Sequence, residues 1–154
     1  MDKKALLRRL NESLALEQAL IEAEGAIAGR ATVPDVRQVT TNAIRDDENH
    51  LVLMRRMITD LGGRVEPPPM ESVAWIEALV RNINATDDTL DRIGLLRMMK
   101  GRAVSTGELM DRIRFTLGNP PEMEPLVTML RQDREHAQNL ARLEARLAST
   151  EIFL

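Results

Sequence analysis

Two short segments of this sequence place a carboxylate and an imidazole three residues apart. They are Asp47-x-x-His50 and Asp133-x-x-His136, and they contain the two histidines of the chain. Residues three apart on a helix lie on one face about one turn from each other, so both side chains of a pair can reach one point. Borderline divalent metal ions accept imidazole nitrogen and carboxylate oxygen together. The two pairs therefore predict a metal site, provided that their helices face each other.

The same residues interrupt apolar stripes of predicted helices. Apolar residues at helical spacing surround both pairs, and a third stripe, on the N-terminal helix, carries Glu17 and then Glu24 in the same way. Such stripes face the core of a bundle, so these polar groups are expected to point inward. The apolar members of the three stripes are Leu7, Leu10, Leu14, Ile21 and Ala28, then Val36, Ala43, Met54, Met57 and Leu61, then Leu126, Met129, Leu140, Leu143 and Leu147.

A second interpretation of these residues needs no metal. A histidine on an apolar stripe is more often a hydrogen-bonded core residue, and Asp–His pairs can bond across helices on their own. We favour the metal site because both histidines occur in the same spacing, each near the middle of a long helix. In that interpretation the carboxylates would neutralise the bound ions inside the core.

The elements that position these residues are four long helices, because Leu, Ala, Met, Glu and Arg dominate while Gly and Pro gather in short stretches. The second long helix should begin at Pro34, because proline is favoured as the first helical residue. Helices should stop at two turns, Leu61-Gly62-Gly63 and Gly118-Asn119-Pro120-Pro121. The expected cap of the third long helix is Thr86 or Asp87. We predict helices over 3–28, 34–61, 86–117 and 122–149. The crossover over 62–85 contains a shorter helix from about Glu71 to Val80.

The unequal connections predict the topology. Short turns join the first long helix to the second and the third to the fourth, which makes each pair antiparallel. The long crossover lets the third helix run parallel to the second. The sequence therefore predicts an all-α four-helix bundle, formed by two antiparallel hairpins, in a single domain over residues 1–154.

Composition excludes several other classes of function. The chain has 154 residues, no Cys and a formal net charge of −3, so it offers no disulfide, no thiolate metal site and no basic stripe for nucleic acid. No apolar run reaches the length of a membrane span, and no nucleotide-binding loop is present. The first residues have no apolar core or cleavage site, so a signal peptide is not expected. We expect a cytoplasmic protein with no membrane or nucleic-acid partner and no nucleotide or flavin cofactor.

The segments around these ligand candidates resemble the ferritin-like superfamily, which includes bacterioferritin and rubrerythrin. The resemblance rests on Leu10–Glu17, on Asp46–Met54 with the turn at 61–63, and on Asp133–Ala137. It implies the ferritin-like form of the bundle, with iron or manganese in the core and oxidation chemistry as a further function. It also implies a homo-oligomer, a dimer or larger. The implied metal ligands are Glu17, Asp47, His50, Asp133 and His136.

Three departures separate the chain from the family pattern of one Glu on the first and third long helices and Glu-x-x-His on the second and fourth. Asp47 and Asp133 replace glutamates and reach less far by one methylene. Lys100 lies where the third-helix Glu is expected, and an ammonium there could replace one metal ion by pairing with the carboxylates. The chain also has no Tyr, whereas family members that handle oxygen often carry one near the metals, so efficient ferroxidase or peroxidase chemistry is not expected.

Two hypotheses for function follow. In one, the bundle binds iron or manganese through the five implied ligands, and no catalytic residue is assigned. In the other, Lys100 pairs with Glu17, Asp47 or Asp133 in a degenerate, metal-free bundle that acts as a structural or interaction module. Further apolar residues beside the inner stripe predict self-association in either case: Ile44, Leu51, Leu53 and Ile58.

Overall fold

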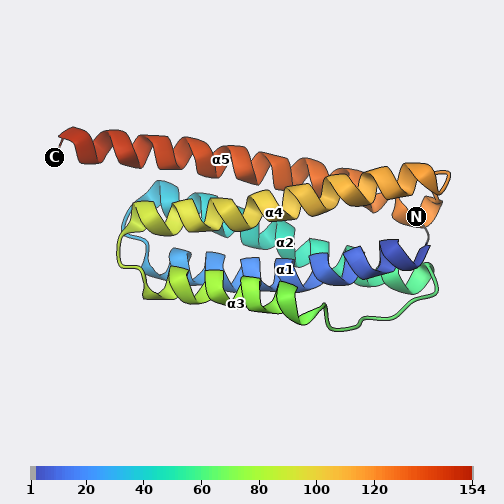
Figure 1. Cartoon of the computed structure of the whole chain (residues 1–154). Helices are drawn as coiled ribbons and strands as arrows, with labels where there is room; N and C mark the ends of the chain where they lie inside the picture. The colour runs from blue at the N-terminus through green and yellow to red at the C-terminus, as the bar shows by residue number, and fades with distance from the viewer. Residues whose placement is uncertain (1–2, 154) are drawn as a thin grey trace.

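The computed structural model describes residues 3–153, which form helices and connecting turns with no β-strand. Four long helices lie lengthwise beside one another, and a shorter helix packs along one side of them (Figure 1). The predicted all-α bundle is thereby confirmed. The helices are α1 (Lys3–Arg30), α2 (Pro34–Asp60), α3 (Met70–Ala85), α4 (Thr89–Thr116) and α5 (Pro125–Phe153), with a short 3-10 turn, η1 (Pro121–Met123), before α5.

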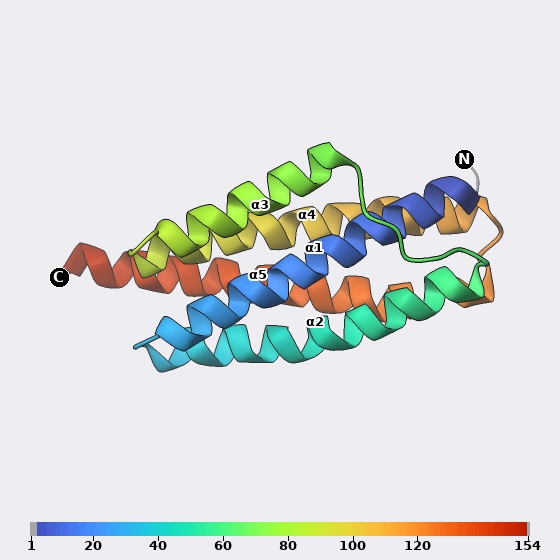
Figure 2. The same cartoon turned by 90° about the horizontal axis from the view of Figure 1, so that it is seen from below.

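The path of the chain gives two antiparallel hairpins joined by one long crossover. Helices α1 and α2 run in opposite directions, as do α4 and α5, whereas α2 and α4 run in parallel (Figures 1 and 2). The crossover returns along the bundle through an extended segment and α3, which packs against α1 and α4. This is the topology that the connection lengths predict.

Two glycines end the hairpin helices where the sequence predicts. Gly62 and Gly118 have φ angles of 81° and 79°, the left-handed conformation that a residue without Cβ adopts without strain. After α2, the N–H of Gly63 donates to the carbonyl of Ile58 at 2.9 Å, and after α4 the N–H of Asn119 donates to that of Arg114 at 2.9 Å. These bonds satisfy carbonyls that each helix end leaves free.

The start of α4 differs from the sequence prediction. Its cap is Asp88, whose carboxylate accepts a hydrogen bond from the N–H of Leu90 at 3.0 Å, and not Thr86 or Asp87. Thr86 instead follows the end of α3, where its hydroxyl donates to the carbonyl of Asn82 at 2.6 Å. The helix of the crossover therefore extends to Ala85, beyond the predicted end at Val80.

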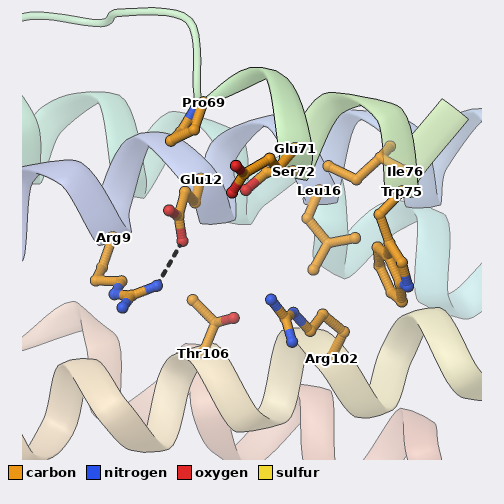
Figure 3. Close-up of a pocket in the computed structure, with 10 residues that line it drawn as sticks. All are labelled: Arg9, Glu12, Leu16, Pro69, Glu71, Ser72, Trp75, Ile76, Arg102 and Thr106. Carbon is orange, nitrogen blue, oxygen red and sulfur yellow. Dashed lines mark hydrogen bonds and ion pairs between the residues drawn. The ribbon is translucent and has the colours of Figure 1, made fainter.

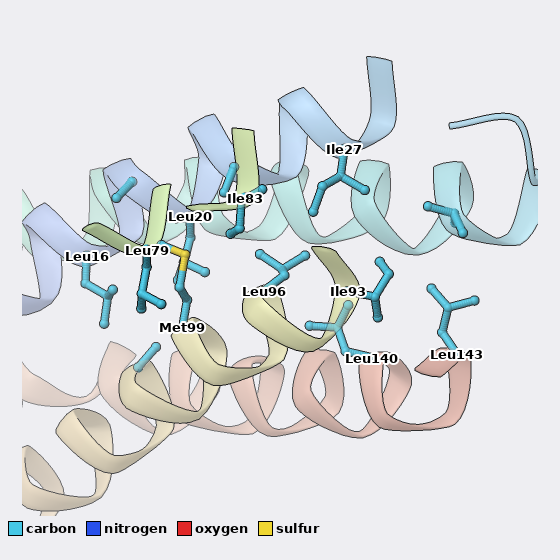
Figure 4. Close-up of a cluster of buried hydrophobic side chains, with 14 of the residues drawn as sticks. Leu16, Leu20, Ile27, Leu79, Ile83, Ile93, Leu96, Met99, Leu140 and Leu143 are labelled. Carbon is cyan, nitrogen blue, oxygen red and sulfur yellow. The ribbon is translucent and has the colours of Figure 1, made fainter. Parts of the chain in front are cut away.

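The hydrophobic core is divided into two clusters along the bundle. One cluster contains Leu20, Leu96 and Leu140 and lies beneath α3 (Figure 4). The other lies towards the opposite end and contains Leu10, Met54 and Met129. Truncating a buried leucine of this kind to alanine typically costs about 2–5 kcal/mol. On α2 and α5 the residues with predicted chemistry lie between the two clusters, whereas Glu17 on α1 and Lys100 on α4 lie among residues of the Leu20 cluster.

The apolar residues that predict self-association are largely used within this chain. Ile58 is fully buried in the cluster of Leu10, and Leu51 and Leu53 are half-buried against it. Large apolar side chains that are exposed include Val52 and Val127. Within residues 3–153, no helix combines the length and apolar composition that crossing a membrane requires.

Candidate metal centre

The structure brings the predicted site residues together in the middle of the bundle. Each long helix contributes to the centre, and all six side chains are buried, at exposed fractions from 0 to 6%. The residues are Glu17 from α1, Asp47 and His50 from α2, Lys100 from α4, and Asp133 and His136 from α5. The three-residue spacing places each Asp and His on one face of its helix, as predicted.

Four of these residues present metal-ligand atoms to one another. One ligand atom each of Glu17, Asp47, His50 and Asp133 lies within 4.8 Å of the other three. His50 Nδ1 is 3.4 Å from Glu17 Oε1, and it is 3.5 and 3.6 Å from the Oδ1 atoms of Asp47 and Asp133. These four residues could therefore hold one divalent ion between them.

Both ring nitrogens of His50 face oxygen atoms. Besides the contact of Nδ1 with Glu17, Nε2 lies 2.7 Å from Oε1 of Gln132, which is half-buried on α5. Burial alone would lower the pKa of His50, but the hydrogen bond and charge of Glu17, together with Asp133, raise it to about 9. Without a metal the ring is therefore protonated at neutral pH and donates from both nitrogens.

His136 has a different environment although its sequence spacing is the same. Its Nε2 lies 2.8 Å from Oδ2 of Asp46, a half-buried carboxylate on α2 that fixes the ring. Its Nδ1 lies 3.7 and 3.8 Å from the Oδ1 atoms of Asp47 and Asp133. Burial and the charge of Lys100 lower the pKa of His136. With the proton on Nε2, the lone pair of Nδ1 points to the centre.

Lys100 is fully buried and forms ion pairs with carboxylates from three other helices. Its Nζ donates to both oxygens of Asp47, at 2.9 and 3.0 Å, and to Oδ1 of Asp133 at 3.4 Å. Burial would lower the pKa of Lys100, but Asp47, Glu17 and the other carboxylates raise it well above its ordinary value. The side chain is therefore a permanent cation inside the bundle.

Glu24 is a further member of the centre that the sequence places on the stripe but not in the site. It is 0% exposed, and its Oε2 lies 3.8 Å from Nζ of Lys100. Burial raises the pKa of Glu24 well above its ordinary value, more than the charge of Lys100 lowers it. The signal available in the sequence is its position seven residues after Glu17, which returns a side chain to the same helix face.

The carboxyl groups of the centre divide into two kinds. Burial and the charges of Asp133 and Asp47 raise the pKa of Glu17 well above its ordinary value. Burial acts in the same direction on Asp47, but the charge of Lys100 outweighs it and lowers the pKa of Asp47. Without a metal, Glu17 therefore holds a proton more readily than Asp47, which is the nearest counter-ion of Lys100.

Several buried polar atoms of the centre have no hydrogen-bond partner among the described residues. They are Oε2 of Glu17, both side-chain oxygens of Glu24 and Nδ1 of His136. Buried polar groups are usually paired, so unpaired ones call for a specific explanation. Carboxylate oxygens and an imidazole nitrogen are donors that iron and manganese accept. The donor set therefore fits a divalent metal ion.

A surface groove of about 380 Å³ between α1, α3 and α4 lies outside this centre (Figure 3). The guanidinium carbon of Arg102 is 5.5 Å from the ring centroid of Trp75, and Arg9 pairs with Glu12 at 2.9 Å. None of the residues of the centre lines this groove. The groove is therefore separate from the buried centre.

Comparison with known proteins agrees with the observed architecture. No family model and no curated protein matches the chain. A solved structure described as a ferritin-like, diiron-carboxylate protein from Bacillus anthracis superposes with a TM-score of 0.73 at 19% sequence identity. The match covers 94% of this chain and 99% of the other. The chain therefore has the ferritin-like fold.

Proposed function

We propose that the protein binds a divalent metal ion in the centre of the bundle. The observation that carries the proposal is the group of four buried ligand atoms from three helices, all within 4.8 Å of one another. Glu17, Asp47, His50 and Asp133 would hold the ion, with Gln132 orienting the imidazole of His50 through Nε2. His136 would line the other side of Asp47 and Asp133, its ring held by Asp46.

Iron and manganese are the ions that we propose for this site. Mixed carboxylate and imidazole donors suit both ions, and the chain has no thiolate that would favour a softer metal. The similar Bacillus anthracis structure is described as a diiron-carboxylate protein, which supports the same choice. Either ion would supply Lewis acidity and one-electron redox chemistry. Oxidation chemistry is therefore the activity class that we propose to test first.

A metal-free structural or interaction module is the second candidate function. The contacts of Lys100 with Asp47 and Asp133 favour it, because an ammonium already neutralises charge that a metal would otherwise neutralise. The metal-free module gives no role to the unpaired donor atom Oε2 of Glu17. For this reason we place metal binding first.

Metal content decides between the two candidates. The chain is purified without oxygen and without chelator, and iron and manganese are measured per chain together with the thermal midpoint before and after metal removal. We expect bound metal whose removal lowers the midpoint, because a ligand that binds only the folded state stabilises it. The variant Glu17→Gln should lose the metal, whereas Glu22→Gln, which removes an exposed carboxylate from the same helix, should retain it. Metal-free protein whose midpoint does not respond to Fe(II) or Mn(II) would support the structural module.

Self-association and a cytoplasmic location complete the proposal. The exposed Val52 and Val127 support contact between copies. Light scattering coupled to size exclusion would give the mass, and we expect at least a dimer. A monomer at micromolar concentration would contradict that part of the proposal without affecting metal binding.

A further inference from the structure

The centre is asymmetric although its two Asp-x-x-His pairs have the same spacing. The rings of His50 and His136 are stacked, with centroids 6.4 Å apart and planes inclined by 26°. Both Nδ1 atoms lie within 3.8 Å of the Oδ1 atoms of these two carboxylates. The donors therefore outline two adjacent positions that share Asp47 and Asp133.

Different residues complete the two positions. On the side of His50, the third carboxylate is Glu17, at 3.4 Å from the imidazole. His136 lies outside the group of four ligand atoms, and the ammonium of Lys100 contacts both shared carboxylates. One position thus has four metal donors, and the other contains a fixed positive charge.

We propose that the centre takes one metal ion per chain, held on the side of His50, and that the ammonium of Lys100 occupies the place of a second ion beside His136. This inference rests on the proposed function and specifies how many ions the site holds and where. The ion and the ammonium would share the charge of Asp47 and Asp133. A second dication beside His136 would have to displace a cation that is already paired at 2.9 Å.

Glu24 could supply a third carboxylate to the second position if Lys100 were replaced. Its Oε2 is 3.8 Å from Nζ of Lys100, and its carboxyl group also interacts with that of Asp47. Replacing Lys100 with a neutral side chain of similar length would leave Glu24, Asp47, Asp133 and His136 around the vacated place. The variant Lys100→Met is therefore expected to gain a metal site without gaining a ligand.

The number of bound ions tests the inference. Metal-stripped full-length protein is dialysed against Mn(II), and bound manganese is measured by elemental analysis and by electron paramagnetic resonance. We expect one ion per wild-type chain with the spectrum of an isolated ion, and two ions with a coupled spectrum in Lys100→Met, purified with Mn(II) present. The double variant Lys100→Met with Glu24→Gln should return to one. Two ions in the wild type, or one in Lys100→Met, would overturn the inference while the proposed function stands.

The two histidines provide a test that does not depend on folding of the Lys100 variant. We expect His50→Gln to reduce bound Mn(II) at least tenfold and His136→Gln to retain one ion. Equal losses in both variants, or a loss confined to His136→Gln, would overturn the assigned position. Absence of Mn(II) binding to the wild-type chain would overturn the proposed function itself, so the two failures are distinguishable.

Discussion

Nζ of Lys100 on α4 lies 2.9 and 3.0 Å from the two carboxylate oxygens of Asp47 on α2, and both side chains are 0% exposed. The pair joins α2 and α4, which run in the same direction (Figure 1). Transfer of two charges out of water costs several kcal/mol for each, and the attraction between them offsets this only when the geometry is good and the remaining groups are bonded. Removing either Lys100 or Asp47 should therefore lower the free energy of unfolding by more than removing one partner of a surface ion pair.

The variant Lys100→Met should destabilise the metal-free protein by roughly 3–5 kcal/mol, because it leaves Asp47 and Asp133 buried without their closest cation. Urea denaturation in the presence of a chelator measures the change. The control is Lys4→Met, which removes an exposed lysine of α1 and should change the free energy of unfolding by less than about 0.5 kcal/mol. Equal stability of the two variants would show that Lys100 does not compensate these charges.

Two isosteric changes distinguish the ionised and neutral carboxyl groups. Asp47→Asn should cost the metal-free protein roughly 3–5 kcal/mol, because the ammonium of Lys100 loses its nearest counter-ion. Glu24→Gln should cost less than Asp47→Asn, because the pKa of Glu24 is raised and that of Asp47 is lowered, so the fold favours the charged form of Asp47 only. Chemical denaturation at pH 7 compares them. A larger loss of stability in Glu24→Gln than in Asp47→Asn would contradict the assignment of the charged carboxylate to Asp47.

The stability of the metal-free protein should fall as pH rises from about 6.5 to about 9. The pKa of His50 is raised from 6.5 to about 9 in the folded state, so its proton stabilises the fold fully below pH 6.5, and this stabilisation is lost as pH rises through about 9. The raised pKa values of Glu17 and Glu24 act in the same direction from about pH 4.5 upwards. Denaturation midpoints across this range give the slope.

The variant His50→Gln is the control for this pH dependence. Because it removes the titrating ring, its stability should change less between pH 6.5 and pH 9 than that of the wild type. A wild-type stability that is flat or increases across this range would contradict the assigned protonation of His50.

Two glycines of α4 should respond differently to alanine. Gly101 is exposed and a Cβ there would meet nothing within 4 Å, so Gly101→Ala should stabilise the helix by about 0.5–1 kcal/mol. A Cβ at Gly107 would lie 2.8 Å from Cδ1 of Leu130 on α5, which is 5% exposed. The required repacking should leave Gly107→Ala less stable than Gly101→Ala by about 1–3 kcal/mol. Thermal denaturation measures both, and equal midpoints would mean that α4 and α5 separate at little cost.

The helix ends and most residues of the centre could be predicted from the sequence, and the reasons are physical. The glycine stops at Gly62 and Gly118 need a backbone conformation that few other residues adopt. A charged residue in an apolar stripe, such as Asp47, has few alternatives to the interior of a bundle. The all-α fold with one crossover followed from these signals and from the connection lengths.

The orientation of Lys100 and the contacts between helices could not be derived in the same way. A helix lysine usually extends its ammonium to solvent, and only the packed structure shows Lys100 directed inward. The partners Asp46 and Gln132 lie next to the stripe residues Asp47 and Asp133 in sequence, but their contacts depend on how α2 faces α5. The same interhelical geometry decides which histidine shares its position with Glu17.

A crystal structure of the protein soaked in Mn(II), with anomalous scattering recorded at the manganese edge, tests the account most directly. We predict one anomalous peak per chain, coordinated by Glu17, Asp47, His50 and Asp133, with Nζ of Lys100 still in contact with Asp47. A centre without a peak would contradict metal binding. Two peaks, or one beside His136, would contradict the role assigned to the lysine.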